Sequence, residues 1–188
     1  MSSISAYFLR TERLGFRFWS EADLELAVGL WGDFAVTRLF DGRGPLSIEQ
    51  VRARLRQEIA TQTEHRVQYW PIFLIESGDH IGCAGLRPYD LSGNIFEIGF
   101  HIRSNCWRRG YASEATRAVM AYAFSSLKVG GLFAGHHPNN KASANLLQKL
   151  GFRYTHDEFY EPTGLQHPSY LLNAVEYAER HNRKMHPG

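Results

Sequence analysis

The hydrophobic pattern changes its period in the middle of the chain, between residues 94 and 127. Residues 95–102 alternate and are rich in β-branched and aromatic side chains, which predicts a strand. After a short basic turn, apolar residues recur at three- and four-residue steps and predict an amphipathic helix; they are Ala115, Val119, Met120, Ala123, Phe124 and Leu127. We therefore expect a strand that runs through a basic turn into a helix.

The N-terminal third has its own helix and strand signals. Alternation predicts a first strand from Arg13 to Trp19, with one face buried. Ser20 and Ser47 each precede a run of apolar residues at helical spacing, so both are predicted to be N-caps. Between these two helices, residues 41–45 are rich in turn formers and are expected to form a mobile loop.

Hairpins are predicted on both sides of the central unit. Strands are expected over residues 69–75 and 81–87, joined by a hairpin turn, with another turn over residues 89–94. Three hairpin-linked strands that lead into a helix indicate a mixed α/β fold. Downstream, the pattern predicts a strand at 132–137, a helix at 142–150 that Gly151 ends, and a hairpin of strands 152–160 and 169–175.

Composition narrows the class of protein. The chain shows no internal repeat or linker, so residues 1–188 are expected to form one domain, with a frayed charged tail at 179–188. There are 21 Lys and Arg against 19 Asp and Glu, a net charge of +2, which gives no reason to expect a nucleic-acid or membrane partner. No signal-peptide pattern or stretch of transmembrane length is present, and the two cysteines, Cys83 and Cys106, have no metal-type spacing. We expect a soluble cytoplasmic protein without a metal.

The turn before the central helix has the chemistry of an anion site. A helix start presents unpaired backbone N–H groups and the positive end of the helix dipole. Gly110 allows a ligand to approach the backbone closely, Ala112 keeps the next position small, and Arg108 and Arg109 add positive charge. A phosphate or pyrophosphate is the expected ligand. The alternative is that Gly110 merely starts the helix and the arginines are solvated.

This turn resembles the acetyl-coenzyme A loop of the GNAT superfamily of N-acetyltransferases, whose pattern is Gln/Arg-x-x-Gly-x-Gly/Ala. Gly110 and Ala112 match the pattern, and Trp107 replaces its first residue, as in many ribosomal-protein alanine N-acetyltransferases (the RimJ/RimL-like subgroup). Three further short motifs are similar to those of that subgroup: Thr11-Glu12-Arg13-Leu14, Asn140-Lys141-Ala142-Ser143 and Lys149-Leu150-Gly151-Phe152. The resemblance therefore extends over nearly the whole chain.

The resemblance implies a fold and a coenzyme site. The fold is a mostly antiparallel sheet with helices on both faces, in which the strand at 98–102 splays from the strand at 133–137. Pantetheine enters that gap and pairs with free backbone groups. Asn140 is implied to face the pantetheine arm, although it could equally be an N-cap. The implied coenzyme contacts are Ile98, Phe100, Ile102, Arg108, Arg109, Gly110, Tyr111, Ala112, Ser113, Asn140 and Ser143.

The catalytic groups are less clearly marked. Leu147 stands where many members of the superfamily carry a tyrosine acid, and the subgroup instead assigns a serine that corresponds to Ser143. Ser143 could also be simply a polar residue of a first helical turn. Glu97 is a candidate base, although a structural ion pair with Arg103 would explain it equally well. Other candidates for the base are His136, His137, Glu158, Tyr160 and Glu161, and no spacing argument chooses among them.

These features predict an enzyme that transfers an acetyl group from acetyl-coenzyme A directly to a primary amine, either a protein N-terminus or a small molecule. A different class of function is a coenzyme-binding sensor that has lost catalysis, which the missing tyrosine favours. An unrelated mononucleotide-binding protein is disfavoured, because the chain has neither a Gly-Lys-Ser/Thr phosphate loop nor a Gly-x-Gly-x-x-Gly fingerprint. Homodimers are common among the resembled proteins, so a homodimer is a further expectation.

Overall fold

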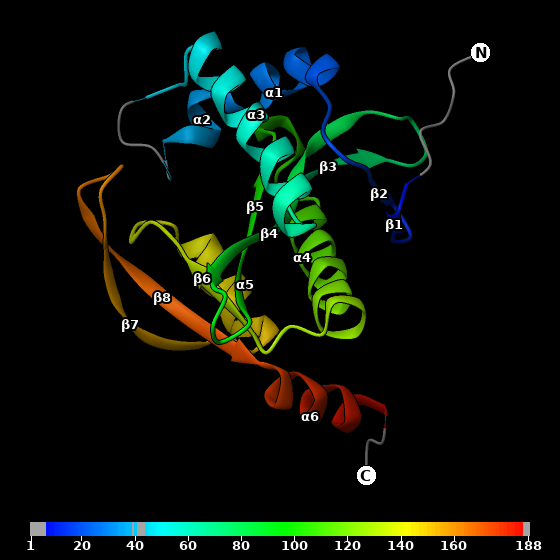
Figure 1. The fold of residues 1–188 in the computed structure, drawn as a ribbon, viewed down its shortest axis with the longest axis vertical. Coiled ribbons are helices and arrows are strands. Elements are labelled where there is room, and N and C mark those ends of the chain that lie inside the picture. Colours follow the sequence, from blue (N-terminus) through cyan, green and yellow to red (C-terminus); the bar gives the residue numbers. More distant parts are fainter. Residues whose placement is uncertain (1–6, 39, 41–43, 186–188) are drawn as a thin grey trace.

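One sheet of eight strands runs through the computed structural model, which describes residues 7–38, 40 and 44–185 (Figure 1). The strand order is β1-β2-β3-β4-β5-β6-β8-β7, and every neighbouring pair is antiparallel except β5 and β6. The strands are β1 (Leu9–Arg10), β2 (Leu14–Phe16), β3 (Tyr69–Leu74), β4 (His80–Asp90), β5 (Ile95–Ile102), β6 (Gly131–Gly135), β7 (Arg153–Tyr160) and β8 (Leu165–Asn173). The expected mixed α/β fold is confirmed.

Helices cover both faces of this sheet, as expected. On one face lie α1 (Leu24–Trp31), the short α2 (Phe34–Thr37) and α3 (Ile48–His65), whose apolar residues form a core cluster with Tyr69 and Cys83. On the other face lie α4 (Tyr111–Tyr122), which continues into a π-helical turn (Ala123–Leu127), and α5 (Lys141–Leu150). The chain then ends its described part in α6 (Ala174–Met185). No helix in the described ranges is both long and apolar enough to cross a bilayer.

The central strand divides its side chains between the two cores. Ile98 and Ile102 of β5 are buried in the cluster under α4 and α5. His101, which alternation places on the opposite face, contacts the Trp31 and Tyr69 side chains of the other cluster. Glu97 lies on the same face as His101 and contacts Tyr69 as well. Strand alternation predicted this division correctly.

The first predicted strand is shorter than its pattern suggested. Only Leu14–Phe16 pairs in β2, because the chain leaves the sheet and Trp19 turns into the core under α1, where its Nε1–H donates to the Tyr69 carbonyl at 2.7 Å. Ser20 begins a helical turn with a capping box to Asp23, so the predicted cap is confirmed. Ser47 forms a second capping box, with Gln50, at the start of α3.

Two strand boundaries differ from expectation, and two short elements were not predicted. β4 continues to Asp90, so Tyr89 lies on a strand; Asp90 closes the turn by accepting from the Ser92 and Gly93 N–H groups at 3.1 and 3.2 Å. β8 begins at Leu165, earlier than predicted, which leaves a shorter hairpin connection. β1 and α2 were not predicted, since elements this short carry no readable period. Of the loop expected to be mobile, residues 41–43 lie outside the described residues.

The tail was expected to fray over residues 179–188, but α6 makes it helical as far as Met185; residues 186–188 lie outside the described residues. At the start of α6, the Glu176 N–H donates to Asn173 Oδ1 at 2.9 Å, and the Asn173 N–H donates to Glu176 Oε2 at 3.0 Å. The Tyr177 ring then stacks on Phe124 with ring centroids 4.3 Å apart. A cap and an aromatic anchor therefore stabilise a segment whose charge had suggested a solvated coil.

Two residues near the N-terminus hold the start of α4 across the sheet. The Thr11 hydroxyl donates to Glu114 Oε1 at 2.5 Å, and the Arg13 backbone N–H donates to the same oxygen at 3.1 Å. The Arg13 side chain donates through Nε to Glu114 Oε2 at 2.7 Å and stacks over the Tyr111 ring at 4.6 Å. Thr11 and Arg13 thereby fix the first turn of α4.

Replacing this carboxylate should lower stability in a pH-dependent way. Burial opposes its ionisation, but the hydrogen bonds from Thr11 and Arg13 outweigh burial and lower the pKa of Glu114 below its ordinary value of 4.5. A lowered folded-state pKa means that the stabilisation is complete above pH 4.5 and is lost as the pH falls through the folded value. For Glu114→Gln we expect the free energy of unfolding at pH 7 to fall by about 1 kcal/mol, a value reduced for the exposure of Arg13.

Thermal unfolding measured at pH 7 and at pH 3 checks this expectation. The melting temperature of Glu114→Gln should be about 2–4 °C below that of the unmodified protein at pH 7, and the two should approach each other at pH 3. Glu25→Gln, at an exposed glutamate in the first turn of α1, is the matched control and should change little. A gap that is the same at both pH values would contradict the role given to the Glu114 carboxylate.

Candidate active site

The two parallel strands at the centre of the sheet part after a short contact. β5 and β6 pair only through Ile95 with Gly131, Phe96 with Leu132 and Glu97 with Phe133. Beyond this point β5 continues to Ile102 along β4, whereas β6 continues to Gly135 along β8. The facing edges therefore carry backbone groups that no strand between them satisfies. The expected splay is present, and it opens beside Glu97.

The basic turn is held above this opening at both ends. Trp107 Nε1–H donates to the Ile102 carbonyl at 2.7 Å, and Arg13 donates to the Arg109 carbonyl at 3.1 Å. Gly110 is the N-cap of α4 with a φ of 83°, a left-handed conformation that favours glycine, and no side chain caps the helix. The first-turn N–H groups of Tyr111, Ala112 and Ser113 thus point out of an uncapped helix start.

The start of α5 carries the two other predicted contact residues. Asn140 Oδ1 accepts from the Ser143 backbone N–H at 3.1 Å, so its interpretation as an N-cap is confirmed. The Ser143 side chain is partly exposed, one turn from Leu147, which is buried in the core shared with α4. Leu147 packs as a core residue at the position where the resembled family carries a tyrosine. Gly151 ends the helix with a φ of 98°, as predicted.

Glu97 forms its hydrogen bond with Tyr69, an aromatic residue of a predicted strand to which the sequence gave no contact with Glu97. The Tyr69 hydroxyl donates to Glu97 Oε1 at 2.9 Å, and the Glu97 side chain is partly exposed. The ion pair with Arg103 considered above is not formed, because the Arg103 guanidinium crosses to α1 and β4, where it donates to the Leu26 carbonyl at 3.0 Å and to His80 Nδ1 at 3.2 Å.

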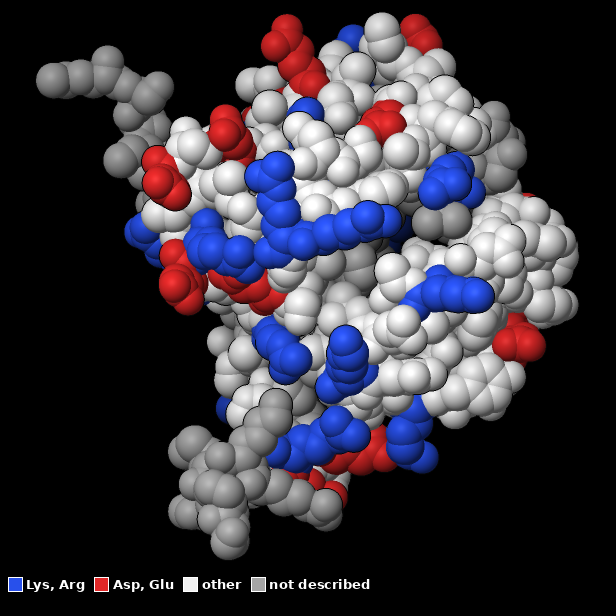
Figure 2. Space-filling model, turned by 180° about the vertical axis from the view of Figure 1, so that it is seen from behind, with Lys and Arg blue, Asp and Glu red and all other residues white. Residues whose placement is uncertain are grey.

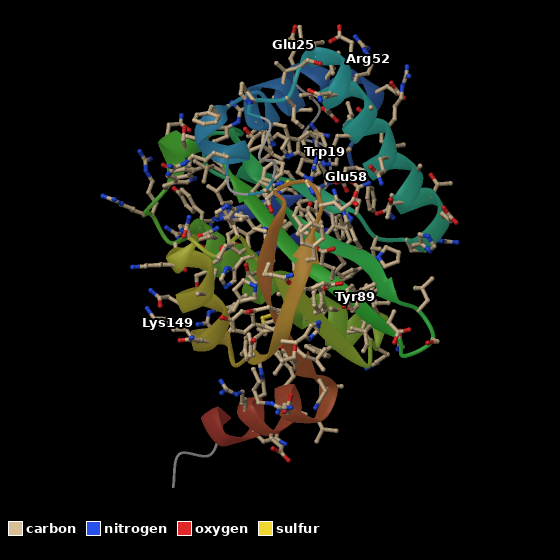
Figure 3. All side chains as sticks on the ribbon, turned by 90° about the vertical axis from the view of Figure 1, so that its left-hand side faces the viewer. Trp19, Glu25, Arg52, Glu58, Tyr89 and Lys149 are labelled. Atoms are coloured by element: carbon tan, nitrogen blue, oxygen red, sulfur yellow. The ribbon has the colours of Figure 1, made fainter. Side chains whose placement is uncertain are left out.

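A buried charge pair lies behind Glu97. Arg87, the register partner of Glu97 on β4, forms an ion pair with Glu58 and stacks over the Tyr69 ring at 4.3 Å. Glu58 also accepts from the Tyr69 backbone N–H at 2.9 Å, and Figure 3 shows it on the inner side of α3. Burial raises the pKa of the Tyr69 hydroxyl well above its ordinary value, and the Glu97 carboxylate adds to the increase. Tyr69 therefore acts as a hydrogen-bond donor at neutral pH.

The predicted histidine is not brought to Glu97. The His136 ring is buried, stacks on Tyr170 at 5.4 Å, and has Nδ1 2.9 Å from the His137 carbonyl oxygen. Tyr170 belongs to the core under α4 and α5, on the opposite face of the sheet from Glu97. His137 contacts His167 instead. Partial burial lowers the pKa of His137 and of His167, and the neighbouring histidines lower these pKa values further.

Glu158 of the last hairpin lies on the same side as Glu97. The Tyr89 ring stacks on Phe133 with centroids 3.9 Å apart and an interplanar angle of 6°, and its hydroxyl forms a hydrogen bond with Glu158. Partial burial raises the pKa of Tyr89, and the nearby Glu158 carboxylate raises it further. Figure 3 shows Tyr89 beside the β7–β8 hairpin. Because Phe133 is the register partner of Glu97, these aromatic rings form a wall next to the carboxylate.

Positive charge lies over the face of the molecule that α4 and α5 cover. In Figure 1, α4 lies behind α3. Figure 2 shows the molecule from the back, and Lys and Arg side chains cross the middle of that face. A hollow of about 370 Å³ lies between α4, α5 and α6, away from Glu97. Its lining residues are Arg117, Met120, Ala121, Lys149, Leu150, Tyr177, Arg180 and His181.

The cysteines show no catalytic arrangement. Cys83 is fully buried, which raises its pKa to about 12, and its Sγ is 3.8 Å from His101 Nδ1. Cys106 is partly exposed and donates to the adjacent Asn105 Oδ1 at 3.4 Å. Within residues 7–38, 40 and 44–185, no group of three or more His, Cys, Asp and Glu side chains is placed to hold a metal ion.

Sequence reasoning placed Tyr69 and Tyr89 among aromatic residues that could line an acceptor pocket, but gave neither a hydrogen bond, and it did not single out Arg87. Tyr69 and Arg87 occupy predicted strands, and alternation alone assigns them a face without revealing their charged neighbours. A signal was present for Tyr69: Gly85 and Gly99, one on each of the two following strands, leave room for a large ring. Tyr89 had been assigned to a turn, so its contribution to the site was hidden.

Comparison with known proteins shows which protein family this chain belongs to. Residues 13–153 match the model of the acetyltransferase (GNAT) domain. The uncharacterized N-acetyltransferase YoaA of Bacillus subtilis (strain 168) is 32% identical over 145 residues, which cover 77% of this chain and 82% of the relative. A GNAT-family acetyltransferase from Bacillus anthracis has a TM-score of 0.77 at 23% identity, with 89% of this chain and 99% of that chain covered. RimL, a ribosomal L7/L12 α-N-protein acetyltransferase in complex with coenzyme A, has a TM-score of 0.77 at 14% identity, with 91% and 99% covered. The chain is therefore an acyltransferase that belongs to the GNAT family of acetyltransferases.

Proposed function

We propose that this enzyme transfers an acetyl group from acetyl-coenzyme A directly to a primary amine in a ternary complex. The observation that carries the proposal is the end of β5–β6 pairing at Glu97 and Phe133, beside the uncapped start of α4. A thioester arm needs an unpaired strand edge, and a pyrophosphate needs free N–H groups. The unpaired edge of β5 runs from Glu97 to Ile102, and the short basic turn that follows leads into the start of α4.

The coenzyme is proposed to bind along this path. The N–H groups of Tyr111, Ala112 and Ser113 would hold the pyrophosphate, with Arg108 and Arg109 exposed beside it. Pantetheine would add to the free edge of β5, where the predicted contacts are Ile98, Phe100 and Ile102. The Asn140 Nδ2 would face the arm, since Oδ1 is occupied by the helix cap. Coenzyme A bound to the structurally similar RimL supports this choice of ligand.

Two residues of the chain are proposed to take part in the reaction. The amine nitrogen forms a bond to the acetyl carbon, the carbon–sulfur bond breaks, and the amine proton passes to the Glu97 carboxylate. The Ser143 hydroxyl keeps its proton and donates a hydrogen bond to the departing thiolate, which stabilises the developing negative charge; the thiolate takes its proton from water. The Ser143 side chain is partly exposed, on the helix whose cap is Asn140. We do not assign a step to His136, because it packs on the opposite face from Glu97.

The acceptor is proposed to be either a protein N-terminal amine, as in the RimJ/RimL-like subgroup, or a small-molecule amine. It would enter on the face of α1 and α3, where Glu97, Glu158 and the Tyr89–Phe133 pair are found. Carboxylates and aromatic faces attract an ammonium group before it loses its proton. A screen of coenzyme A release with amines and N-terminal peptides tests the proposal. Turnover of at least one acceptor is expected, whereas binding without turnover on any would favour the sensor.

A substitution at the coenzyme turn tests the binding assignment. Gly110→Val places a β-branched side chain at a φ of 83° and into the position proposed for the phosphates. We expect its affinity for acetyl-coenzyme A, measured by titration calorimetry, to fall by roughly tenfold or more. Gly78→Val is the matched control, because Gly78 has a φ of 77° in the β3–β4 turn with open space around it. Normal affinity in Gly110→Val would refute the assignment.

A second substitution tests the thiolate donor. Ser143→Ala should lower kcat on the order of 10²-fold, the scale for loss of one donor to developing negative charge, and should leave acetyl-coenzyme A affinity nearly unchanged. Steady-state kinetics with the best acceptor and calorimetry measure the two quantities. Ser126→Ala, at an exposed serine beyond α4, is the control. An unchanged kcat in Ser143→Ala would remove Ser143 from catalysis.

A further inference from the structure

Tyr69 reaches Glu97 across a strip of sheet that carries no side chain. The strand register pairs Tyr69 with Gly85 and Gly85 with Gly99, so the three residues form one row across β3, β4 and β5. A Cβ atom on Gly99 would lie 2.2 Å from the Tyr69 hydroxyl oxygen and 2.5 Å from Cζ, closer than real contacts allow. Glycine at position 99 is therefore a condition for the hydrogen bond to Glu97.

The Tyr69 side chain is also held from its other sides. Its ring packs under the Arg87 guanidinium at 4.3 Å and edge-on to His101 at 5.8 Å. Its backbone N–H is bound to Glu58, a fully buried carboxylate that forms an ion pair with the same Arg87. The side chain is 3% exposed, whereas Glu97 is partly exposed. The Tyr69 hydroxyl is therefore a rigid hydrogen-bond donor to Glu97, whose carboxylate remains partly exposed to solvent.

We propose that Tyr69 is the positioning residue for the base: its hydroxyl holds Glu97 Oε1, so that the other carboxylate oxygen faces the opening between β5 and β6, and Gly99 keeps the path between them clear. This inference rests on the proposed function. A partly exposed glutamate has several rotamers of similar energy, and a fixed donor selects one. Tyr69 would thereby convert a mobile surface carboxylate into an oriented base.

Charged and titratable groups surround the Glu97 carboxylate, so a test variant must leave them in place. The titratable and charged groups on the elements around Glu97 are Tyr69 of β3, Arg87 and Tyr89 of β4, His101 of β5, Arg54 and Glu58 of α3, and Glu158 of β7. Tyr69→Phe keeps the ring that these groups pack against and removes only the donor.

Nuclear magnetic resonance gives a test that needs no acceptor. The side-chain carboxyl carbon of Glu97, labelled with ¹³C and assigned with Glu97→Gln, is observed at neutral pH in the unmodified protein and in Tyr69→Phe. We expect the chemical shift of this carbon to change in Tyr69→Phe, and the side-chain scalar couplings of Glu97 to average over several rotamers. Tyr122→Phe, at a tyrosine of α4 that packs on Trp70 from the opposite face, should leave both in place. An unchanged shift and unchanged couplings in Tyr69→Phe would overturn the inference.

Kinetics then separate positioning from packing. Tyr69→Phe should lower kcat roughly tenfold, which corresponds to about 1.4 kcal/mol, without changing the KM for acetyl-coenzyme A. In a Glu97→Gln background, Tyr69→Phe should cause no further loss, because its effect passes through Glu97. Independent, multiplying losses would contradict the inference.

A glycine substitution tests the same contact from the other side. Gly99→Ala should displace the Tyr69 hydroxyl and reproduce both the averaged Glu97 couplings and the lower kcat, in a protein whose hydroxyl is intact. Gly131→Ala is the matched strand control, since a Cβ there would meet its nearest atom at an ordinary 3.5 Å. If the unmodified enzyme acetylates no amine, the proposed function fails, while the Glu97 couplings still decide whether Tyr69 holds Glu97.

Discussion

The early end of the pairing between β5 and β6 is the constraint on which the site depends. β4 holds β5 through a ladder that extends to Ile102, and β8 holds β6 as far as Gly135, so each strand follows its own antiparallel partner. Backbone groups on the two facing edges must then bind water or a ligand, because leaving them unpaired costs free energy. The fold thereby supplies a ready edge for a chain-like ligand, and the same edge begins next to Glu97.

The structure stabilises this opening from both faces. On one side, Thr11 and Arg13 bind Glu114 and so tie the start of α4 to the strand region at the beginning of the chain. On the other side, Arg87 and Glu58 form a buried ion pair under α3. Removing one member of such a pair leaves an uncompensated charge, so arrangements of β3, β4 and β5 that separate Arg87 from Glu58 are unfavourable. The ion pair therefore favours one arrangement of these three strands. Rigidity around an unpaired edge is what an oriented transfer reaction requires.

Local signals predicted the parts of this fold that local physics determines. Capping at Ser20 and Ser47 and the left-handed Gly151 follow from a few neighbouring residues, and the period of β5 and α4 follows from burial of one face. Contacts between distant segments escaped prediction: Tyr69 and Glu97 are 28 residues apart, and no pattern along the chain encodes their register. The helical tail was missed for the same reason, since its aromatic anchor lies on another element.

Amide hydrogen exchange with and without acetyl-coenzyme A tests the central claim most directly. The account predicts new protection at Ile98, Phe100 and Ile102 on β5, at Gly135 on β6, and at the first-turn amides Tyr111–Ser113 of α4, because their N–H groups point away from β4 and β8 or out of the helix start and have no strand or helix partner. Unchanged exchange at these amides in the presence of saturating acetyl-coenzyme A, or protection confined to other elements, would contradict it.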